Sequence, residues 1–240
     1  MQLKNLFALI AVGGLMVAAP ALAQGTATKP TTPAPATTTT TPPAKPAPKA
    51  DKPMDKTPGT TTAAKTGETA PAFELMDTDG KTVKLSDFKD KIVLLEWFNP
   101  ECPVIVDHHK TQTTFADLHK EFNSKGVVFL AINSSAAGMQ GNGKDLNAKM
   151  KKDWALPYPI LLDESGKTGR AFGAKTTPHV FIIGKDGKLA YHGAIDNQKK
   201  SDAADYKNYA KQALNQMIKG ETVTEAETKA YGCGVKYGKM

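Results

Sequence analysis

Cysteine and arginine are the scarcest chemically active residues in this 240-residue chain: it has two cysteines, and its only arginine is Arg170. The longest apolar run has 14 residues, at positions 6–19, whereas a membrane-spanning helix needs about 20. The chain contains no internal repeat and no glycine-rich phosphate loop. These absences give no support for a membrane span, a repeat protein or a nucleotide-binding loop. The main candidates for chemistry are therefore the two cysteines, at positions 102 and 233.

The first 23 residues have the three parts of a secretory signal peptide. A positive charge at Lys4 precedes the apolar run, and the small-residue motif Ala-Leu-Ala ends at Ala23. This arrangement is typical of a cleaved signal peptide; an uncleaved membrane anchor is the alternative. We therefore expect an exported protein, periplasmic or extracellular, in an environment where two cysteines can persist as a disulfide.

Residues 24–66 are rich in proline, threonine, alanine and lysine and contain no aromatic residue. Such a segment cannot bury enough apolar surface to offset its conformational entropy, which predicts a disordered linker; a cell-wall spacer is the alternative. Of the net charge of +7, the signal peptide carries +1 and the linker, with six lysines and two aspartates, carries +4. The remaining +2 leaves residues 67–240 nearly neutral, so nucleic-acid binding is not implied.

Residues 67–240 have the length of one domain. Apolar runs at 92–95, 127–132 and 158–163 predict strands, and they alternate with helical patterns at 101–126, 143–156 and 165–173. Two hairpins are predicted, around the turns at 77–80 and 186–187, and a capped helix is predicted at 201–220. This order predicts an α/β sandwich with a mixed central sheet.

Cys102 follows a buried strand at the point where a helix is expected to begin, with Pro103 in its first turn. Free N–H groups and the helix dipole at that position favour a thiolate, whereas a negative Glu101 next to it opposes one. The alternatives are an inert buried thiol and a metal ligand. Pro178, preceded by Thr177, opens the apolar run 179–183; it is either an ordinary first strand residue or a cis-proline.

The opening GETAPAFELMDTDGK, the strand-to-helix cysteine and the stretch RAFGAKTTPHVFIIGKDGKLAYHG together resemble the thioredoxin-like fold. Within it they are similar to the redoxins related to alkyl hydroperoxide reductase and thiol-specific antioxidants. The segments EWFNPECP and YGCGVKY also resemble a set of exported thioredoxin-family proteins. The resemblance implies a cis-Pro178 that faces Cys102, and a Thr177 backbone that is offered to an extended substrate.

The sequence departs from the motifs of these relatives. If Cys102 ends a C-x-x-C pattern, Asn99 takes the place of the first cysteine, so local dithiol exchange is impossible. The threonine motif and the thiolate-stabilising arginine of peroxiredoxins are also absent, and Lys175 is the remaining candidate for a point charge. Cys233 lies between two glycines near the C-terminus. A tail that folds back would make it a resolving cysteine; a purely structural disulfide is the alternative.

Three histidines and a tryptophan complete the candidate residues. His108 and His109 lack the i,i+4 spacing that joins two metal ligands, so they are interpreted as polar helix surface rather than a copper or zinc site. His179 is the better candidate to tune the thiol. Trp97 is expected in the core, with part of its ring lining the site.

We therefore predict an exported thiol oxidoreductase that performs thiol–disulfide exchange or reduces a peroxide. Cys102 is the nucleophile, Cys233 the resolving partner, and Asn99, Thr177 and Pro178 shape the site. No cofactor and no metal are expected; the partners are a thiol- or disulfide-bearing protein or a peroxide, together with an electron donor that the sequence does not name. The alternative is a non-catalytic binding module with a structural disulfide or a copper-type metal role.

Overall fold

The computed structural model describes residues 63–239. The predicted signal peptide, and the predicted linker up to residue 62, lie outside the described residues. The strands are β1 (Glu74–Asp77), β2 (Thr82–Lys84), β3 (Ile92–Trp97), β4 (Val127–Asn133), β5 (Ile160–Leu162), β6 (Thr176–Thr177), β7 (Val180–Ile183), β8 (Leu189–Gly193) and β9 (Cys233–Gly234). The helices are α1 (Pro103–Val106), α2 (Thr114–Phe122), α3 (Lys144–Asp153), α4 (Lys167–Phe172) and α5 (Tyr209–Ile218), with 3-10 turns at Leu85–Phe88 and Asn123–Lys125 and a π turn at Asp107–Thr111.

The main sheet has seven strands in the order β2-β1-β5-β4-β3-β7-β8. Strand β3 lies parallel to β4 and antiparallel to β7, and β4 lies parallel to β5. The hairpins β1–β2 and β7–β8 are antiparallel, as predicted from their turns. The predicted mixed sheet is confirmed, and β3, the strand that leads to Cys102, is an inner strand between β4 and β7.

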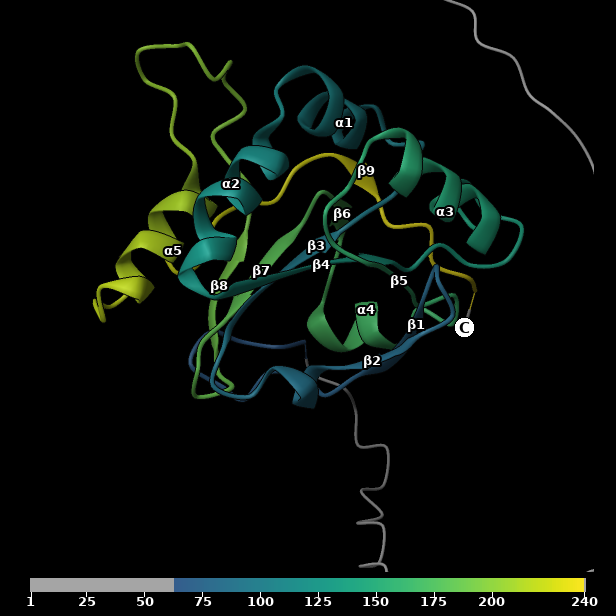
Figure 1. The fold of residues 1–240 in the computed structure, drawn as a ribbon, viewed down its shortest axis with the longest axis horizontal. Helices are drawn as coiled ribbons and strands as arrows, with labels where there is room; N and C mark the ends of the chain where they lie inside the picture. Colours follow the sequence, from purple (N-terminus) through teal and green to yellow (C-terminus); the bar gives the residue numbers. More distant parts are fainter. Residues whose placement is uncertain (1–62, 240) are drawn as a thin grey trace, which may run out of the picture. The chain divides into compact units, whose positions relative to one another are not determined.

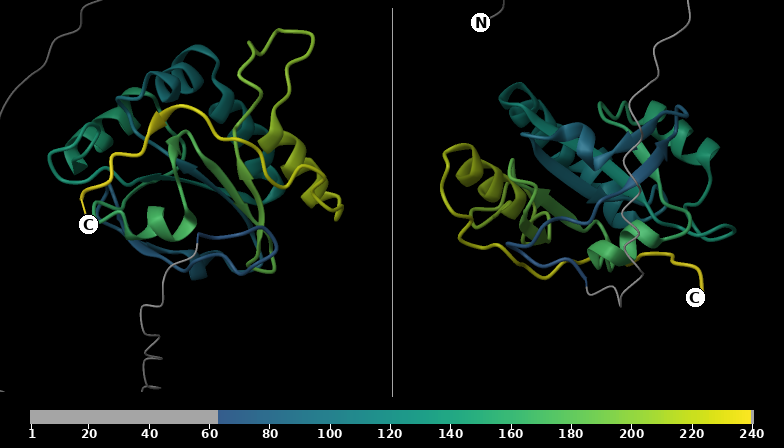
Figure 2. Two further views of the ribbon diagram at one scale, coloured as in Figure 1. Left: turned by 180° about the vertical axis from the view of Figure 1, so that it is seen from behind. Right: turned by 90° about the horizontal axis from the view of Figure 1, so that it is seen from below.

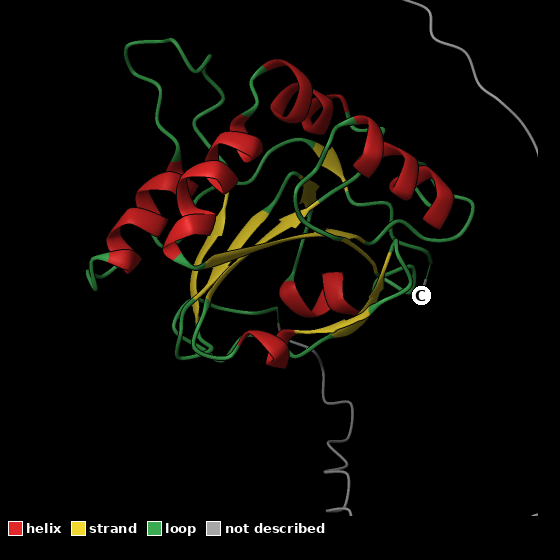
Figure 3. Ribbon diagram, in the orientation of Figure 1, coloured by secondary structure: helices red, strands yellow, loops and turns green. Residues whose placement is uncertain are grey.

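Helices cover both faces of this sheet (Figures 1 and 3). The side chains of β3 alternate between two apolar clusters: Leu94 joins the cluster under α2 and α5, and Leu95 joins the cluster under α4. All six residues of β3 are buried, which explains why the strand reads as a continuous apolar run rather than an alternating one. Each large aliphatic side chain buried here stabilises the fold by about 1.5–3 kcal/mol.

The prediction of one continuous helix over residues 101–126 is wrong. It is divided into α1, the π turn and α2, and Thr113 between the last two has a left-handed backbone with φ of 53°. Threonine is a poor helix former, and the local sequence is Thr-Gln-Thr-Thr. The predicted end of the helical region at Gly126 is confirmed, with Gly126 at φ of 84°.

The predicted start of the last helix, at residue 201, is also wrong. Helix α5 begins at Tyr209, and the side chain of Asn208 caps it by accepting a hydrogen bond from the Lys211 N–H at 2.8 Å. Ser201, Asp202 and Asn208 are all good capping residues, so composition alone does not choose among them. The segment between β8 and α5 forms an extended loop that projects from the domain (Figure 1).

Residues 221–239 form what we call the strap. After α5 the chain runs back across the domain, and β9 pairs with β6 in a small second sheet (Figure 2). At the other end of the domain Ala64 donates its N–H to the carbonyl of Ala171 at 3.1 Å; the domain start at residue 67 stays a prediction. Within residues 63–239 no helix has the length and apolar character that crossing a bilayer requires.

Candidate active site

Cys102 occupies the N-cap position of α1, with Pro103 as the first helical residue. Its backbone is extended, with φ of −82° and ψ of 121°, and its carbonyl accepts the Val106 N–H at 2.9 Å. The predicted position of the sulfur at a helix start is therefore confirmed. The residue is completely buried.

The loop before Cys102 is held by Asn99. The Asn99 side-chain oxygen accepts the Glu101 N–H at 2.9 Å, and its amide donates to the carbonyl of Gln140 at 3.1 Å. The Asn99 carbonyl accepts the Cys102 N–H at 3.0 Å. Asn99 is itself buried, so it shapes the loop from beneath and offers no open surface to a substrate.

The Thr177–Pro178 peptide bond is cis. This bond lies beside the cysteine, since the Cys102 thiol donates to the Thr177 carbonyl at 3.1 Å. Two segments 75 residues apart in sequence thus meet at one sulfur atom. The cis bond and the juxtaposition that the resemblance implies are both present.

Cys233 is brought to the same place by the strap. In the β6–β9 pair Thr177 lies opposite Cys233, and the Thr177 hydroxyl donates to the Cys233 carbonyl at 3.4 Å. Both cysteines are free thiols. Thr177 therefore contacts both cysteines, one through its carbonyl and the other through strand pairing.

The two thiols are shifted in opposite directions. Burial raises the pKa of Cys102, but hydrogen bonds from the Cys233 thiol, the Thr177 side chain and the Ile105 backbone outweigh it and leave this pKa below the ordinary value. Burial and the hydrogen bond to Cys102 raise the pKa of Cys233 to about 11. Of the two thiols, Cys102 is therefore the one that loses its proton more readily, which suits a nucleophile and its partner.

A buried acid–base pair lies under the cysteine helix, and the sequence analysis missed it. Glu96 is fully buried, and its carboxylate contacts His109 Nε2 at 2.8 Å and accepts the Tyr158 hydroxyl at 3.2 Å. Burial and the Glu96 carboxylate raise the pKa of Tyr158 well above its ordinary value. One carboxylate in the apolar run Ile-Val-Leu-Leu-Glu-Trp was the available signal, because a buried charge requires a partner.

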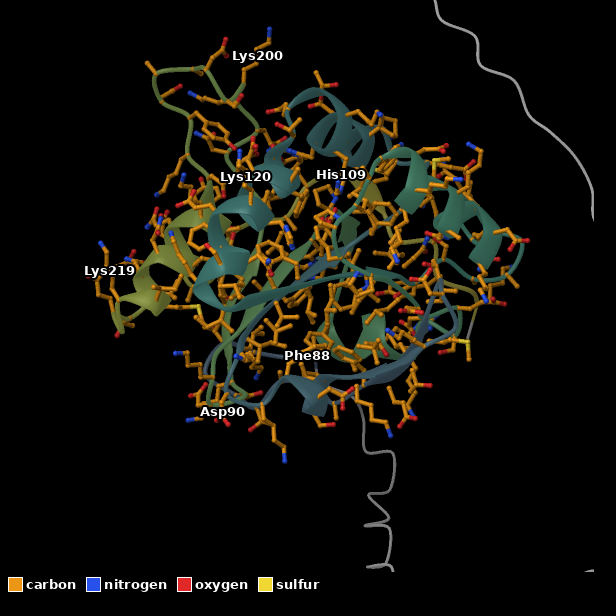
Figure 4. The ribbon with its side chains drawn as sticks, in the orientation of Figure 1. Phe88, Asp90, His109, Lys120, Lys200 and Lys219 are labelled. Carbon is orange, nitrogen blue, oxygen red and sulfur yellow. The ribbon has the colours of Figure 1, made fainter. Side chains whose placement is uncertain are left out.

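The prediction that His108 and His109 form polar helix surface is wrong. The π turn directs both rings inward, and Figure 4 shows His109 among the interior side chains, whereas Lys200 and Lys219 lie at the periphery. His108 Nε2 contacts the Tyr231 hydroxyl of the strap at 2.8 Å, and its Nδ1 contacts the Thr114 hydroxyl at 3.0 Å. Among residues 63–239 there is no cluster of three or more side chains that could hold a metal ion.

His179 and Trp97 lie on the far side of the sheet from Cys102. The His179 Nδ1 accepts the Lys175 N–H at 3.3 Å, and its ring packs on Phe181, which belongs to the cluster under α4. Trp97 is in the same cluster and donates its indole N–H to Ser134. The predicted core position of Trp97 is confirmed. Cys102 belongs to the opposite cluster, so neither ring lies against its sulfur, and a tuning role for His179 has no contact to support it.

Comparisons with known proteins identify the family and support the fold. The family model described as Redoxin matches residues 65–209, more than half of the chain, and the chain belongs to the redoxin family. It is 31% identical over 123 residues to the thiol-disulfide oxidoreductase ResA of Bacillus subtilis, covering 51% of this chain and 64% of that protein. It is 28% identical over 149 residues to the chloroplastic peroxiredoxin Q of Suaeda salsa, covering 57% and 64%.

Two solved structures of unassigned function are similar over most of the domain. A hypothetical protein from Sinorhizobium meliloti has a TM-score of 0.67 at 25% identity and covers 75% of this chain and 98% of its own. An uncharacterized conserved protein from Geobacillus kaustophilus has a TM-score of 0.65 at 27% identity, covering 73% and 94%. The matches with ResA and peroxiredoxin Q cover less than two thirds of those proteins, so their names do not by themselves assign an activity to this chain.

Proposed function

We propose that this redoxin is a thiol-dependent oxidoreductase that cycles between a dithiol and a Cys102–Cys233 disulfide. The observation that carries the proposal is the strand pairing of Thr177 with Cys233, at the residue whose carbonyl contacts the Cys102 sulfur. No C-x-x-C partner is required, because the second sulfur comes from the strap.

The oxidising half of the cycle has two balanced forms. With a peroxide, the Cys102 thiolate attacks one oxygen and becomes a sulfenic acid while the other oxygen leaves as an alcohol or water; the Cys233 thiol then condenses with it and releases water. With a disulfide, Cys102 forms a mixed disulfide and releases one thiol, and Cys233 displaces the second. In both forms an external thiol reductant returns the pair to the dithiol.

The lowered pKa of Cys102 and the raised pKa of Cys233 fit this order of events. The attacking sulfur is the one that loses its proton more readily, and the second sulfur, with a pKa of about 11, keeps its proton until the first has reacted. A thiolate is the reactive form of cysteine, so the assignment of Cys102 as nucleophile follows from the electrostatics as well as from its helix position.

The experiment is an oxidant-consumption assay on the wild type, Cys102→Ser and Cys233→Ser. We expect Cys102→Ser to lose all turnover, and Cys233→Ser to consume one equivalent and then stop unless an external thiol resolves it. Mass mapping should find a Cys102–Cys233 disulfide in the oxidised wild type. Unchanged turnover in Cys102→Ser, or two free thiols after oxidation, overturns the proposal.

A structural staple is the second candidate, and the complete burial of Cys102 is the observation that favours it. A staple and a redox pair differ in reduction potential, because structural bridges in secreted proteins usually lie below about −300 mV. Titration of the disulfide in a dithiothreitol series separates them: a potential above that value supports the redox cycle, and one below it assigns the bond to structure.

Export from the cytoplasm is part of the same proposal. It rests on the sequence of residues 1–23, which the described structure does not include. N-terminal sequencing of the mature protein should begin at Gln24, and a mature protein that keeps Met1 would contradict export by signal cleavage.

A further inference from the structure

The segment Thr176–Thr177 is a short strand outside the seven-stranded sheet, and in the described part of the chain its strand partner is β9 of the strap. A strand edge with free N–H and C=O groups accepts an extended peptide by backbone pairing, whatever the peptide's sequence. Here the strap takes that place in antiparallel register, with Thr176 opposite Gly234 and Thr177 opposite Cys233. The protein thus binds its own tail at the edge beside Cys102.

Gly232 brings the strap into direct backbone contact with this edge. Its φ is +118°, a conformation that side chains disfavour, and a Cβ added there would lie 2.2 Å from the Thr177 carbonyl oxygen. A residue other than glycine at this position would push the strap away from Thr177. Gly234, two residues further on, has open space where its Cβ would be.

Side chains fasten the strap on both sides of Cys233. On one side the Tyr231 hydroxyl donates to the buried carboxylate of Asp196 and contacts His108. On the other side Tyr237 donates to the Ala174 carbonyl at 2.9 Å, and Arg170 stacks on the Tyr237 ring and donates to the Gly238 carbonyl at 2.7 Å. The only arginine of the chain therefore holds the end of the strap.

Beside the strap lies an open cleft of about 550 Å³, which reaches the edge at Thr176 and is bordered by Ala230, Tyr231 and Gly232. Asp196, Asn197 and Gln198, at the base of the projecting loop, also line it. An approaching chain therefore has room to lie next to the strap but not, while the strap is in place, on the Thr176–Thr177 edge itself.

We propose that the strap is a built-in pseudosubstrate: it occupies the edge that an extended, cysteine-bearing polypeptide would pair with, and such a partner reaches Cys102 only when the strap is displaced. The inference rests on the proposed function for the reactivity of Cys102 and adds the regulation of access to it. Displacement concerns the part of the strap at Cys233. There β9 pairs with β6 through two residues on each strand, with one further backbone hydrogen bond from Val235 to Lys175, and none of residues 221–239 is buried. The strap's separate backbone bonds to His192 of β8 can stay in place while this part opens locally.

The test uses the full chain with Cys233→Ser, so that Cys102 is the only thiol and the resolving step is absent. Two probes carry the same nitrobenzoate thiol leaving group: a small symmetrical aryl disulfide, and an unstructured peptide whose single cysteine is joined to that group. In each case the Cys102 thiolate attacks the probe sulfur, a mixed disulfide forms, and the coloured aryl thiolate leaves. The ratio of the two rates measures how much more slowly Cys102 reacts with a polypeptide than with a small molecule.

Gly232→Ala is the opening variant and Gly234→Ala its matched control. We expect Gly232→Ala to raise the rate with the peptide probe about tenfold or more and to raise the rate with the small probe much less, because local opening limits the larger partner. Gly234→Ala should leave both rates unchanged. If Gly232→Ala does not fold by circular dichroism, Tyr231→Phe, which removes the hydroxyl between Asp196 and His108, takes its place. Equal peptide-probe rates in the parent and the opened variant overturn the inference.

The two proposals fail separately. If the peptide probe reacts equally fast with and without the strap contacts while the wild type still forms its disulfide, the pseudosubstrate inference alone is lost. If Gly232→Ala opens the site but the wild type neither consumes oxidant nor forms a disulfide, the proposed function is lost and the strap remains a cover over a buried thiol.

Discussion

The inner strand β3 and the strap contribute to the same site through opposite physical means. Every residue of β3 is buried, and Leu95 and Trp97 have no exposed surface. The strap has no buried residue from 221 to 239. It is held by backbone hydrogen bonds to β6 and β8 and by side-chain contacts that include two tyrosine hydroxyls and Arg170. Burial stabilises by about 1.5–3 kcal/mol for each large side chain, and a hydrogen bond by about 0.5–1.5.

This difference assigns two roles to the two regions. The apolar core fixes Cys102 at the start of α1, and loss of the core packing would unfold the domain. The strap places Cys233 through contacts that can be broken and re-formed one set at a time, which a resolving cysteine and a displaceable cover both need. A thiol positioned by a deep hydrophobic core would be equally precise but could not move away.

Oxidation of the two cysteines should join the strap covalently to the core, and it should change the free energy of unfolding more than any other change considered. A Cys102–Cys233 bond joins two residues that are 131 positions apart in the sequence, and the chain-entropy relation gives a stabilisation of at most about 5 kcal/mol for a loop of this length. Urea unfolding of oxidised and reduced protein, followed by tryptophan fluorescence, measures the difference. Cys233→Ser should gain no such stability on oxidation, because it cannot form the bond. Equal stabilities of oxidised and reduced wild type would mean that the bond does not form in the native fold.

Truncation of one β3 side chain should have the second largest effect on the free energy of unfolding. Leu95→Ala leaves a cavity between the sheet and α4 and should lower the free energy of unfolding by about 2–5 kcal/mol in the reduced protein. Val235→Ala, in the partly exposed strap, is the control and should cost about 1 kcal/mol or less. Similar losses at both positions would show that the strap belongs to the cooperative core.

The sequence predicted the core well because its signals are local and strong. Buried runs such as Ile92–Leu95 and the Asp186–Gly187 turn mark their elements without tertiary information, and the resemblance supplied the cis-Pro178. The sequence did not predict β6 and β9, because strands of two residues have no periodic pattern. It placed His108 and His109 on the surface because helical spacing does not foresee a π turn, and it left Glu96 unremarked within an apolar run.

Acid should lower the free energy of unfolding through His179, which is buried against the core. Burial, with His192 and Lys175 nearby, lowers the pKa of His179 to about 3, against about 6.5 in an unfolded chain. The unfolded state therefore binds the extra proton first, so stability is full above about pH 6.5 and falls as the pH drops toward 3, by up to about 1.4 kcal/mol per pH unit for this one proton.

Unfolding free energies measured from pH 7 to pH 4 would test this dependence against His179→Asn, whose side-chain oxygen replaces Nδ1 as the acceptor for the Lys175 N–H. The variant should have a flatter pH dependence than the wild type. Equal slopes would mean that His179 titrates normally in the folded protein.

Tyr231→Phe is expected to have the smallest effect on the free energy of unfolding but a specific effect on how often the strap opens. The Tyr231 hydroxyl bridges Asp196 and His108, and its removal should change the free energy of unfolding by only about 1 kcal/mol. The strap should nevertheless open more often, so alkylation of Cys102 in the Cys233→Ser background should become faster. Tyr206→Phe is a demanding control, because Tyr206 donates to the same Asp196 carboxylate at 3.2 Å from outside the strap. If both variants accelerate alkylation equally, the effect comes from the Asp196 charge; if only Tyr231→Phe does, the hydroxyl fastens the strap over the thiol.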